Sequence, residues 1–167
     1  MNQAVIIRKA GLEDIPTIGR LAHIIWPIAY GDLMTEDRMQ YMLQLFYSPS
    51  SLQQQMLEKG HEFLMAEMDE EPVGFASFGP LDTNGSYKLH KLYVRTDIQG
   101  KGLGRSLIDA IITSIAATNA TSLFLHVKRD NPAVHFYQKL GFTIIREEDL
   151  DIGNGFFMND YLMEKKL

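Results

Sequence analysis

The chain has 167 residues, no cysteine and a formal net charge of −5. Its length predicts one domain, 1–167, with a core of its own, and the absence of cysteine excludes disulfides, thiolate metal sites and a cysteine nucleophile. The mild acidity is unlike the basic face of a nucleic-acid-binding protein, and no apolar run approaches the roughly 18 residues of a membrane span. With no signal-peptide pattern at the N-terminus, we expect a cytoplasmic protein with no metal, nucleic-acid or membrane partner.

The first third of the chain predicts one strand and three helices. A β-branched run at 5–9 predicts the strand, and a stripe of apolar residues at helical spacing follows it. We expect this first helix to end before Pro27, because proline disfavours helical geometry in the residue ahead of it. Thr35 predicts the N-cap of a second helix, and Ser51 with Gln54 predicts the capping box of a short third one.

The rest of the chain mixes strands and helices. We expect strands at 61–68, 73–78, 89–94, 122–127, 142–147 and 155–164, and helices that begin near Gly102 and Asn131. Pro132 would take the first position of the last helix and Gly141 would end it. This order predicts the α/β (α+β) class, with a mixed sheet of about seven strands flanked by helices.

The stretch KLHKLYVRTDIQGKGLGR, residues 88–105, predicts an anion site. It joins a strand to a helix through glycines, and free N–H groups at a helix N-terminus bind phosphates. The dinucleotide fingerprint fails because Leu107 stands where its last glycine should be, and no glycine precedes Lys-Ser or Lys-Thr as in a P-loop. The pattern present is Gln99-x-x-Gly102-x-Gly104. Read without family context, the turn is a tight strand-to-helix connection.

A second block stands at a suitable distance after the first. It comprises Asn131-Pro132-Ala133, Phe136-Tyr137 and Leu140-Gly141-Phe142, after the strand expected at 122–127. Together the two blocks resemble the GNAT superfamily of acyl-CoA-dependent N-acetyltransferases. The resemblance implies a twisted sheet that splays apart between its fourth and fifth strands, here 89–94 and 122–127, with acetyl-CoA in the gap.

The resemblance also implies which residues bind acetyl-CoA. The strand edge would hydrogen-bond the pantetheine arm, the glycine turn would hold the pyrophosphate, and the second block would contact the cofactor. These residues are Leu92, Tyr93, Val94, Gln99, Gly100, Lys101, Gly102, Leu103, Gly104, Arg105, Asn131 and Phe136. The N–H near Val94 would stabilise the oxyanion of the reaction. The alternatives are that Lys101 and Arg105 are solvated surface charges and that Asn131 is a helix cap.

Two residues are candidates for catalysis. By the resemblance, Tyr137 protonates the departing CoA thiolate, and a phenol of pKa about 10 stays protonated at neutral pH. The alternative for Tyr137 is a core aromatic. Many family members carry a glutamate base on the central strand, where this chain has Lys88 and His90, so His90 is the candidate base. The alternative for His90 is a hydrogen-bonded wall residue, and His126 on the facing strand is a weaker candidate.

The acceptor site is expected around the segment WPIAYGDL, residues 26–33, and the helix start after it. Trp26 and Tyr30 would face the same way, and together with Glu36 and its acidic neighbours they could form a mouth for a cationic amine. A core tryptophan and a charged helix start explain them equally well. This segment and GFFMNDYLMEKKL, residues 155–167, resemble the branch that includes bacterial spermidine/spermine acetyltransferases of the PaiA type.

The function predicted is therefore direct acetyl transfer from acetyl-CoA to a primary amine, with a polyamine or other small cationic amine as the first candidate acceptor. An N-terminal or lysine acetyltransferase acting on peptides or proteins is the second reading. A non-catalytic CoA-binding sensor is the third, against which Tyr137 argues. Exposed strand edges and analogy with the family allow a homodimer.

Overall fold

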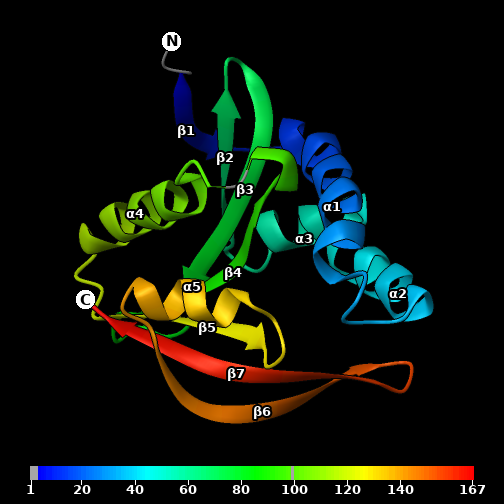
Figure 1. The fold of residues 1–167 in the computed structure, drawn as a ribbon. Coiled ribbons are helices and arrows are strands. Elements are labelled where there is room, and N and C mark those ends of the chain that lie inside the picture. The colour runs from blue at the N-terminus through cyan, green and yellow to red at the C-terminus, as the bar shows by residue number, and fades with distance from the viewer. Residues whose placement is uncertain (1–3, 99) are drawn as a thin grey trace.

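The computed structural model describes residues 4–98 and 100–167. One mixed sheet of seven strands runs through it in the order β1-β2-β3-β4-β5-β7-β6 (Figure 1). All neighbouring strands are antiparallel except β4 and β5, which are parallel. The mixed α/β class and the seven-stranded sheet that the sequence predicts are confirmed.

The elements alternate along the chain much as expected. The strands are β1 (Val5–Ala10), β2 (Glu62–Met68), β3 (Glu71–Pro80), β4 (Ser86–Val94), β5 (Ser122–Lys128), β6 (Thr143–Gly153) and β7 (Phe156–Lys166). The helices are α1 (Ile15–Tyr30), α2 (Glu36–Tyr47), α3 (Pro49–Leu57), α4 (Leu103–Ala116) and α5 (Ala133–Lys139), with short 3-10 turns at Leu12–Asp14 and Thr96–Ile98.

Helices cover both faces of the sheet and make two cores. One core joins the apolar sides of α4 and α5 to β2–β5 and β7, with Leu107, Ile111 and Leu123 fully buried. The other joins α1, α2 and α3 to the opposite side of β2 and β3, around Ile18 and Phe75. Figure 1 shows α4 on one side of β3 and β4 and α1–α3 on the other. An opening in the sheet can therefore be lined by side chains from both helical layers.

The parallel pairing of β4 with β5 is short. It covers four residue pairs, from Ser86 opposite Ser122 to Leu89 opposite Leu125, although β4 continues to Val94. The predicted splay between the fourth and fifth strands is thus confirmed. The register with β3 also shifts at this point: Lys91 pairs with Ser77 and Leu89 with Phe78, so His90 is the extra residue of a bulge. A bulge redirects side chains and is frequent beside active sites.

Several boundaries differ from the sequence prediction. Helix α1 does not end before Pro27 but continues to Tyr30, because proline removes only one helical hydrogen bond while Trp26 and Tyr30 pack against the sheet. Helix α3 begins earlier, at Pro49, with the Ser48 side chain accepting from the Ser51 N–H. Strands β6 and β7 are longer than predicted and form one extended hairpin.

The last helix also begins one residue later than the sequence suggests. Helix α5 starts at Ala133, and Pro132 stands before it in the N-cap position. The Asn131 side chain still serves this end of the helix, since its Oδ1 accepts the Ala133 N–H at 2.9 Å. The expected capping role of Asn131 is thus present with a shifted boundary.

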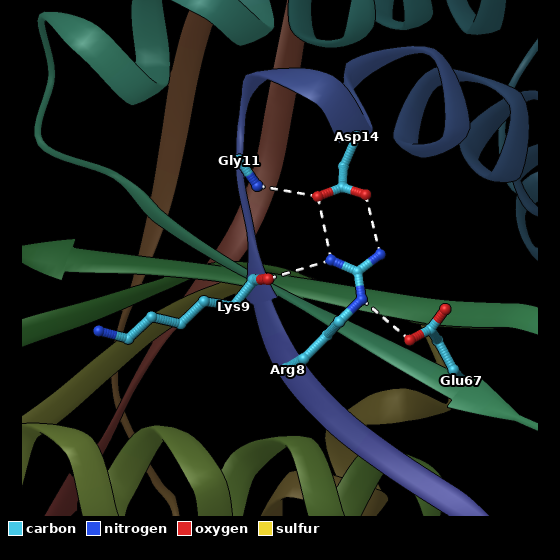
Figure 2. A network of polar contacts seen from close by, with 5 residues as sticks. All are labelled: Arg8, Lys9, Gly11, Asp14 and Glu67. Atoms are coloured by element: carbon cyan, nitrogen blue, oxygen red, sulfur yellow. Dashed lines mark hydrogen bonds and ion pairs between the residues drawn. The ribbon is translucent and has the colours of Figure 1, made fainter. Parts of the chain in front are cut away.

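An ion-pair network fixes the entry to α1 (Figure 2). The Arg8 guanidinium donates to both carboxylate oxygens of Asp14, at 2.9 and 3.1 Å, and to Glu67 Oε1 at 2.9 Å. Asp14 also accepts the Gly11 N–H at 2.9 Å. The hydrogen bonds from Arg8 lower the pKa of the buried Asp14 carboxyl and outweigh the effect of burial. The network ties β1, β2 and the start of α1 together.

We expect Asp14→Ala to lower the free energy of unfolding by about 1–3 kcal/mol near neutral pH, because it leaves the Gly11 N–H and two Arg8 donors unpaired. Partial exposure of Arg8 keeps the loss in this range. Since folding lowers the pKa of Asp14, its contribution is present above its unfolded pKa of about 3.9 and is lost as pH falls through the folded value. Denaturant titrations should therefore give a larger difference from wild type at about pH 7 than at about pH 3. Exposed Asp32→Ala is the control, and an equal loss there would contradict the role of the network.

Candidate active site

A cavity of about 570 Å³ opens where β4 and β5 separate. Its walls come from both strands, from the aromatic sides of α1 and α2, from the end of α3 and from the β6–β7 hairpin. Several sequence-predicted residues lie in this wall: Trp26, Tyr30, His90, Leu92, Tyr93, Val94, Asn131 and Tyr137. The structure thus brings together, from four separate segments, residues predicted to act on donor, acceptor and leaving group.

The edge of β4 is open beyond Leu89. Residues 90–94 have no strand partner on the β5 side, although they still pair with β3 on the other side. Backbone N–H and C=O groups without partners are strong hydrogen-bonding sites, and an extended ligand can bind them as an added strand does. Leu92, Tyr93 and Val94 lie on this open edge, where the sequence analysis expects the pantetheine arm.

The glycine turn lies at the N-terminus of α4, outside the wall of the cavity. Gly100 and Gly102 have positive φ angles of 89° and 76°, and a Cβ at either would meet open space. Gly102 is the N-cap of α4, whose first N–H groups have no helical acceptor. Gln99 lies outside the described residues. The turn has the conformation and the free approach that a phosphate requires.

The other residues of the turn have different surroundings. The Leu103 side chain is buried in the core, so only its backbone is available to a ligand. Arg105 is exposed, with its guanidinium 3.9 Å from Asp109. Gly104 packs closely on Phe136, since a Cβ there would stand 3.2 Å from the ring and would require the ring to shift slightly. Phe136 therefore supports the turn through its ring, and Lys101 stands exposed beside it.

Tyr137 lies on α5, packed edge-on against Phe136 and Phe142, with ring centroids 5.3 and 5.7 Å away. Its side chain is buried and lines the cavity. Burial raises the pKa of the Tyr137 hydroxyl, so the phenol is protonated at neutral pH. Tyr137 is thus part of the core and also lines the cavity with a protonated phenol, so its position is compatible with both readings of the sequence.

His90 stacks on His61, which the sequence analysis did not single out. The ring centroids are 3.7 Å apart and the planes are 15° from parallel. Burial, together with His61 and neighbouring lysines, lowers the pKa of His90 to about 3, and burial with the lysines lowers that of His61 to about 4. Both imidazoles are neutral at neutral pH. Each can accept a hydrogen bond, but so low a pKa makes His90 a weak base.

The predicted acceptor residues separate into two groups. Trp26, Tyr30 and Tyr93 form an aromatic cluster in the wall, with the Tyr30 and Tyr93 hydroxyls 2.9 Å apart. Glu36 is exposed at the start of α2, accepts a hydrogen bond from Gln40 and does not line the cavity. The structure therefore brings the aromatic residues to the site and leaves Glu36 outside.

Helix α2 connects the acceptor side to the β6–β7 hairpin. Arg38 donates to the Phe157 carbonyl, and the Tyr41 hydroxyl donates to the Ile152 carbonyl at 2.6 Å. Ile152 and Met158 of the hairpin line the cavity. Helix α2 and the β6–β7 hairpin thus together bound this side of the cavity.

Comparison with known proteins identifies the family. The acetyltransferase (GNAT) domain matches residues 32–165, which is most of the chain. The chain belongs to the GNAT acetyltransferase family. Its structure is similar to a crystal structure of PaiA N-acetyltransferase from Thermoplasma acidophilum in complex with coenzyme A, with a TM-score of 0.83, 25% identity and coverage of 98% of this chain and 99% of that one.

Two curated GNAT relatives carry different acceptors in their names. The chain is 25% identical over 168 residues to spermidine N(1)-acetyltransferase of Thermoplasma acidophilum, covering 98% of each. It is 32% identical over 150 residues to L-methionine sulfoximine/L-methionine sulfone acetyltransferase of Pseudomonas aeruginosa, covering 83% of this chain and 80% of that protein. The relatives agree on acetyl transfer and differ in acceptor.

In this GNAT protein the cavity holds a buried lysine that the sequence analysis missed. The Lys91 side chain extends to the aromatic residues of α2, with Nζ 4.9 Å from the ring centre of Tyr47 and 5.7 Å from that of Phe46. Lys91 is only 8% exposed, and within residues 4–98 and 100–167 it has no carboxylate partner. Burial, with the nearby Lys59 and Lys88, lowers the pKa of Lys91 to about 7.

A buried carboxylate was missed as well. Asp160 on β7 is 1% exposed and lines the cavity, and its Oδ2 has no hydrogen-bond partner among the described residues. Burial raises the pKa of Asp160, while His126 and the nearby cations oppose the rise. His126 itself pairs with Glu148 at 2.7 Å. Perturbed, unpaired titratable groups in a cleft are typical of functional sites.

Two features are absent from the described residues. No group of three or more histidine, aspartate or glutamate side chains in that part of the chain is arranged to hold a metal ion. None of its helices has both the length and the apolar character needed to cross a bilayer.

We expect Lys91→Met to increase the free energy of unfolding by roughly 1–4 kcal/mol, because a buried ammonium without a carboxylate costs more than its ring contacts return. This corresponds to a Tm at least about 2 °C higher. Folding lowers the pKa of Lys91 from 10.5 to about 7, so the cost is full below about pH 7 and disappears as pH rises toward 10.5. Thermal melts at several pH values should show the gain of Lys91→Met shrinking above neutrality. A lower Tm for the variant at neutral pH would mean that Lys91 stabilises the fold.

Proposed function

We propose that this protein transfers the acetyl group of acetyl-CoA directly to the primary amine of a small molecule. One observation supports the proposal most directly: three features meet where β4 and β5 separate. They are the open edge of β4, the buried and protonated Tyr137, and a cavity wall with titratable side chains. The glycine turn at the start of α4 packs through Gly104 on Phe136, the neighbour of Tyr137 on α5. Membership of the GNAT family and the CoA complex of a similar structure support the same donor.

The residues present suit acetyl-CoA. The open space beside Gly100 and Gly102 and the N–H groups of the first turn of α4 would hold the pyrophosphate, with the positive end of the helix dipole behind them. The unpaired groups of residues 90–94 would bind the pantetheine arm. The remaining volume beside Trp26 and Tyr30 would receive the acceptor.

The wall residues supply what direct transfer needs. The acceptor nitrogen would attack the thioester carbon, and the N–H near Val94 would stabilise the negative charge on the carbonyl oxygen. As the C–S bond breaks, Tyr137 would give its phenolic proton to the thiolate and then regain one from the solvent. The chain has no cysteine, so no thioester with the enzyme is available.

The acceptor amine must lose a proton before or during attack. His90 is in the wall, but its pKa of about 3 gives it little power to take that proton. Asp160 also lines the cavity, and its buried carboxylate has an oxygen without a partner. We therefore assign the base to Asp160 and leave His90 as a neutral hydrogen-bond acceptor.

Two classes of acceptor are each supported by a relative. A polyamine, the first candidate from the sequence, is supported by the spermidine N(1)-acetyltransferase relative. The relative that acts on L-methionine sulfoximine or sulfone supports an amino-acid-like acceptor. Peptide and protein amines remain the alternative acceptors. The alternative that is not an enzyme is a CoA-binding sensor without catalysis.

We expect Tyr137→Phe to lower kcat by about 10²-fold or more, because it removes the proton donor for the thiolate and keeps the packing of the ring. Acetyl-CoA affinity, measured by calorimetry, should stay within about 2-fold of wild type. Tyr87→Phe is the matched control, since Tyr87 stands outside the cavity with its hydroxyl on Thr118. An unchanged kcat in Tyr137→Phe would remove this residue from the mechanism.

The proposed function is tested by thiol release from acetyl-CoA against spermidine, spermine, the L-amino acids and short peptides. We expect turnover with a small amine, and none with Gly102→Val, in which a branched side chain at positive φ would obstruct the phosphate approach. Calorimetry should show weakened acetyl-CoA binding in that variant. Tight acetyl-CoA binding by wild type with no turnover on any amine would favour the sensor instead.

A further inference from the structure

The cavity wall contains more cationic than anionic side chains. Five of its wall residues are lysines or arginine, namely Arg38, Lys59, Lys88, Lys91 and Lys128. Asp160 is the only carboxylate in the same described wall. A polyamine carries several positive charges at neutral pH, so this wall would repel it. The charge of the cavity therefore favours an acceptor that brings negative charge of its own.

Two of these cations already have partners within the protein. Lys128 pairs with Asp130 at 2.8 Å, and Arg38 donates to the Phe157 carbonyl. Lys59, Lys88 and Lys91 have no ion pair with any described carboxylate. Lys91 is the most deeply placed of the three, since it is buried against Phe46 and Tyr47. It has the strongest need for an anion.

The phosphates of the donor do not meet that need. The glycine turn that suits the pyrophosphate is at the N-terminus of α4, and α4 packs in the core on one face of the sheet. Lys91 contacts α2, which belongs to the core on the opposite face. Figure 1 shows these helices on opposite sides of β3 and β4. The anion that Lys91 lacks must therefore come with the acceptor.

The same wall also contains one buried carboxylate. Asp160 is buried on β7, with Oδ2 unpartnered among the described residues, while Lys91 lies on β4 against α2. One cavity thus contains a buried carboxylate and a buried ammonium, and neither has an ion pair among the described residues. A molecule that carries both an ammonium and a carboxylate is complementary to such a pair, and a polyamine is complementary to one of them.

We propose, on the basis of the proposed function, that the acceptor is an amino acid whose carboxylate binds Lys91, with Lys59 and Lys88 nearby, and whose amine faces Asp160. Trp26, Tyr30 and Tyr93 pack beside this site and would contact the apolar part of the amino acid. Lys91 is then a specificity-determining residue, and the energetic cost of burying it is accounted for by recognition of the acceptor carboxylate.

The test begins with thiol release from acetyl-CoA for the twenty standard L-amino acids, their carboxamides and spermidine. We expect the best amino acid to exceed its own carboxamide in kcat/KM by about 10-fold or more, because a charge-assisted hydrogen bond is lost in the carboxamide. Spermidine should be a poorer acceptor than either. A carboxamide equal to its acid, or spermidine as the best acceptor, would overturn the inference and leave the proposed function standing.

The second arm uses Lys91→Met with Lys9→Met as the matched control, since Lys9 is exposed on β1, away from the cavity. We expect Lys91→Met to raise KM for the amino acid by about 10-fold or more and to abolish the preference for acid over carboxamide. KM for acetyl-CoA should not change in either variant. Retention of the preference in a folded Lys91→Met protein would contradict the role of Lys91.

The third arm separates this inference from the proposed function. The same amino acids and carboxamides are titrated by calorimetry into wild type and Lys91→Met, each saturated with CoA. Binding of an amino acid that is lost in Lys91→Met would support the anion site even where no acetyl transfer is seen, in which case only the proposed function fails. Absence of binding by every amino acid would overturn the inference.

Discussion

The short contact between β4 and β5 is the constraint on which the site depends. After Leu89 and Leu125 the two strands separate, and the backbone of residues 90–94 loses its partner on that side. Unpaired backbone groups inside a protein are costly, so such an edge persists where a ligand completes it. The bulge at His90 lies at the same point and changes which β4 side chains face α1–α3. Donor binding and the acceptor wall both follow from this one separation.

Several residues of the cavity wall lower the free energy of unfolding. Lys91 and Asp160 are buried without ion-pair partners among the described residues, and His61 and His90 are stacked and neutral. The aromatic packing around Trp26 in the wall, and the ion pairs around Arg8 away from the cavity, offset this cost. Buried groups that destabilise the fold are expected at a functional site, where they gather in one cavity of an otherwise well-packed protein.

The sequence predicted the fold and the donor side more fully than the acceptor side. The glycine turn and Tyr137 are recognisable because their spacing in the chain is local and their backbone requirements are specific. Lys91 and Asp160 were missed because strand positions show only alternation, and the bulge that sets which side chains face the cavity leaves no mark in composition. Glu36 was expected in the site from its place near Tyr30, yet helix α2 turns it to solvent. Long-range packing decides these positions.

The two faces of the sheet divide the work between them. The α4 and α5 side holds the glycine turn and Tyr137, while the α1–α3 side, with the β6–β7 hairpin, provides the residues that would meet the acceptor. Substitutions on the second side can alter charge without disturbing the first, because the backbone of β4 separates them. The two relatives at 25% and 32% identity are both named as acetyltransferases and differ in the acceptor of their names, which agrees with such a division. Acceptor specificity is therefore best read from the charges on the α1–α3 side, and here those charges include Lys59, Lys88 and Lys91.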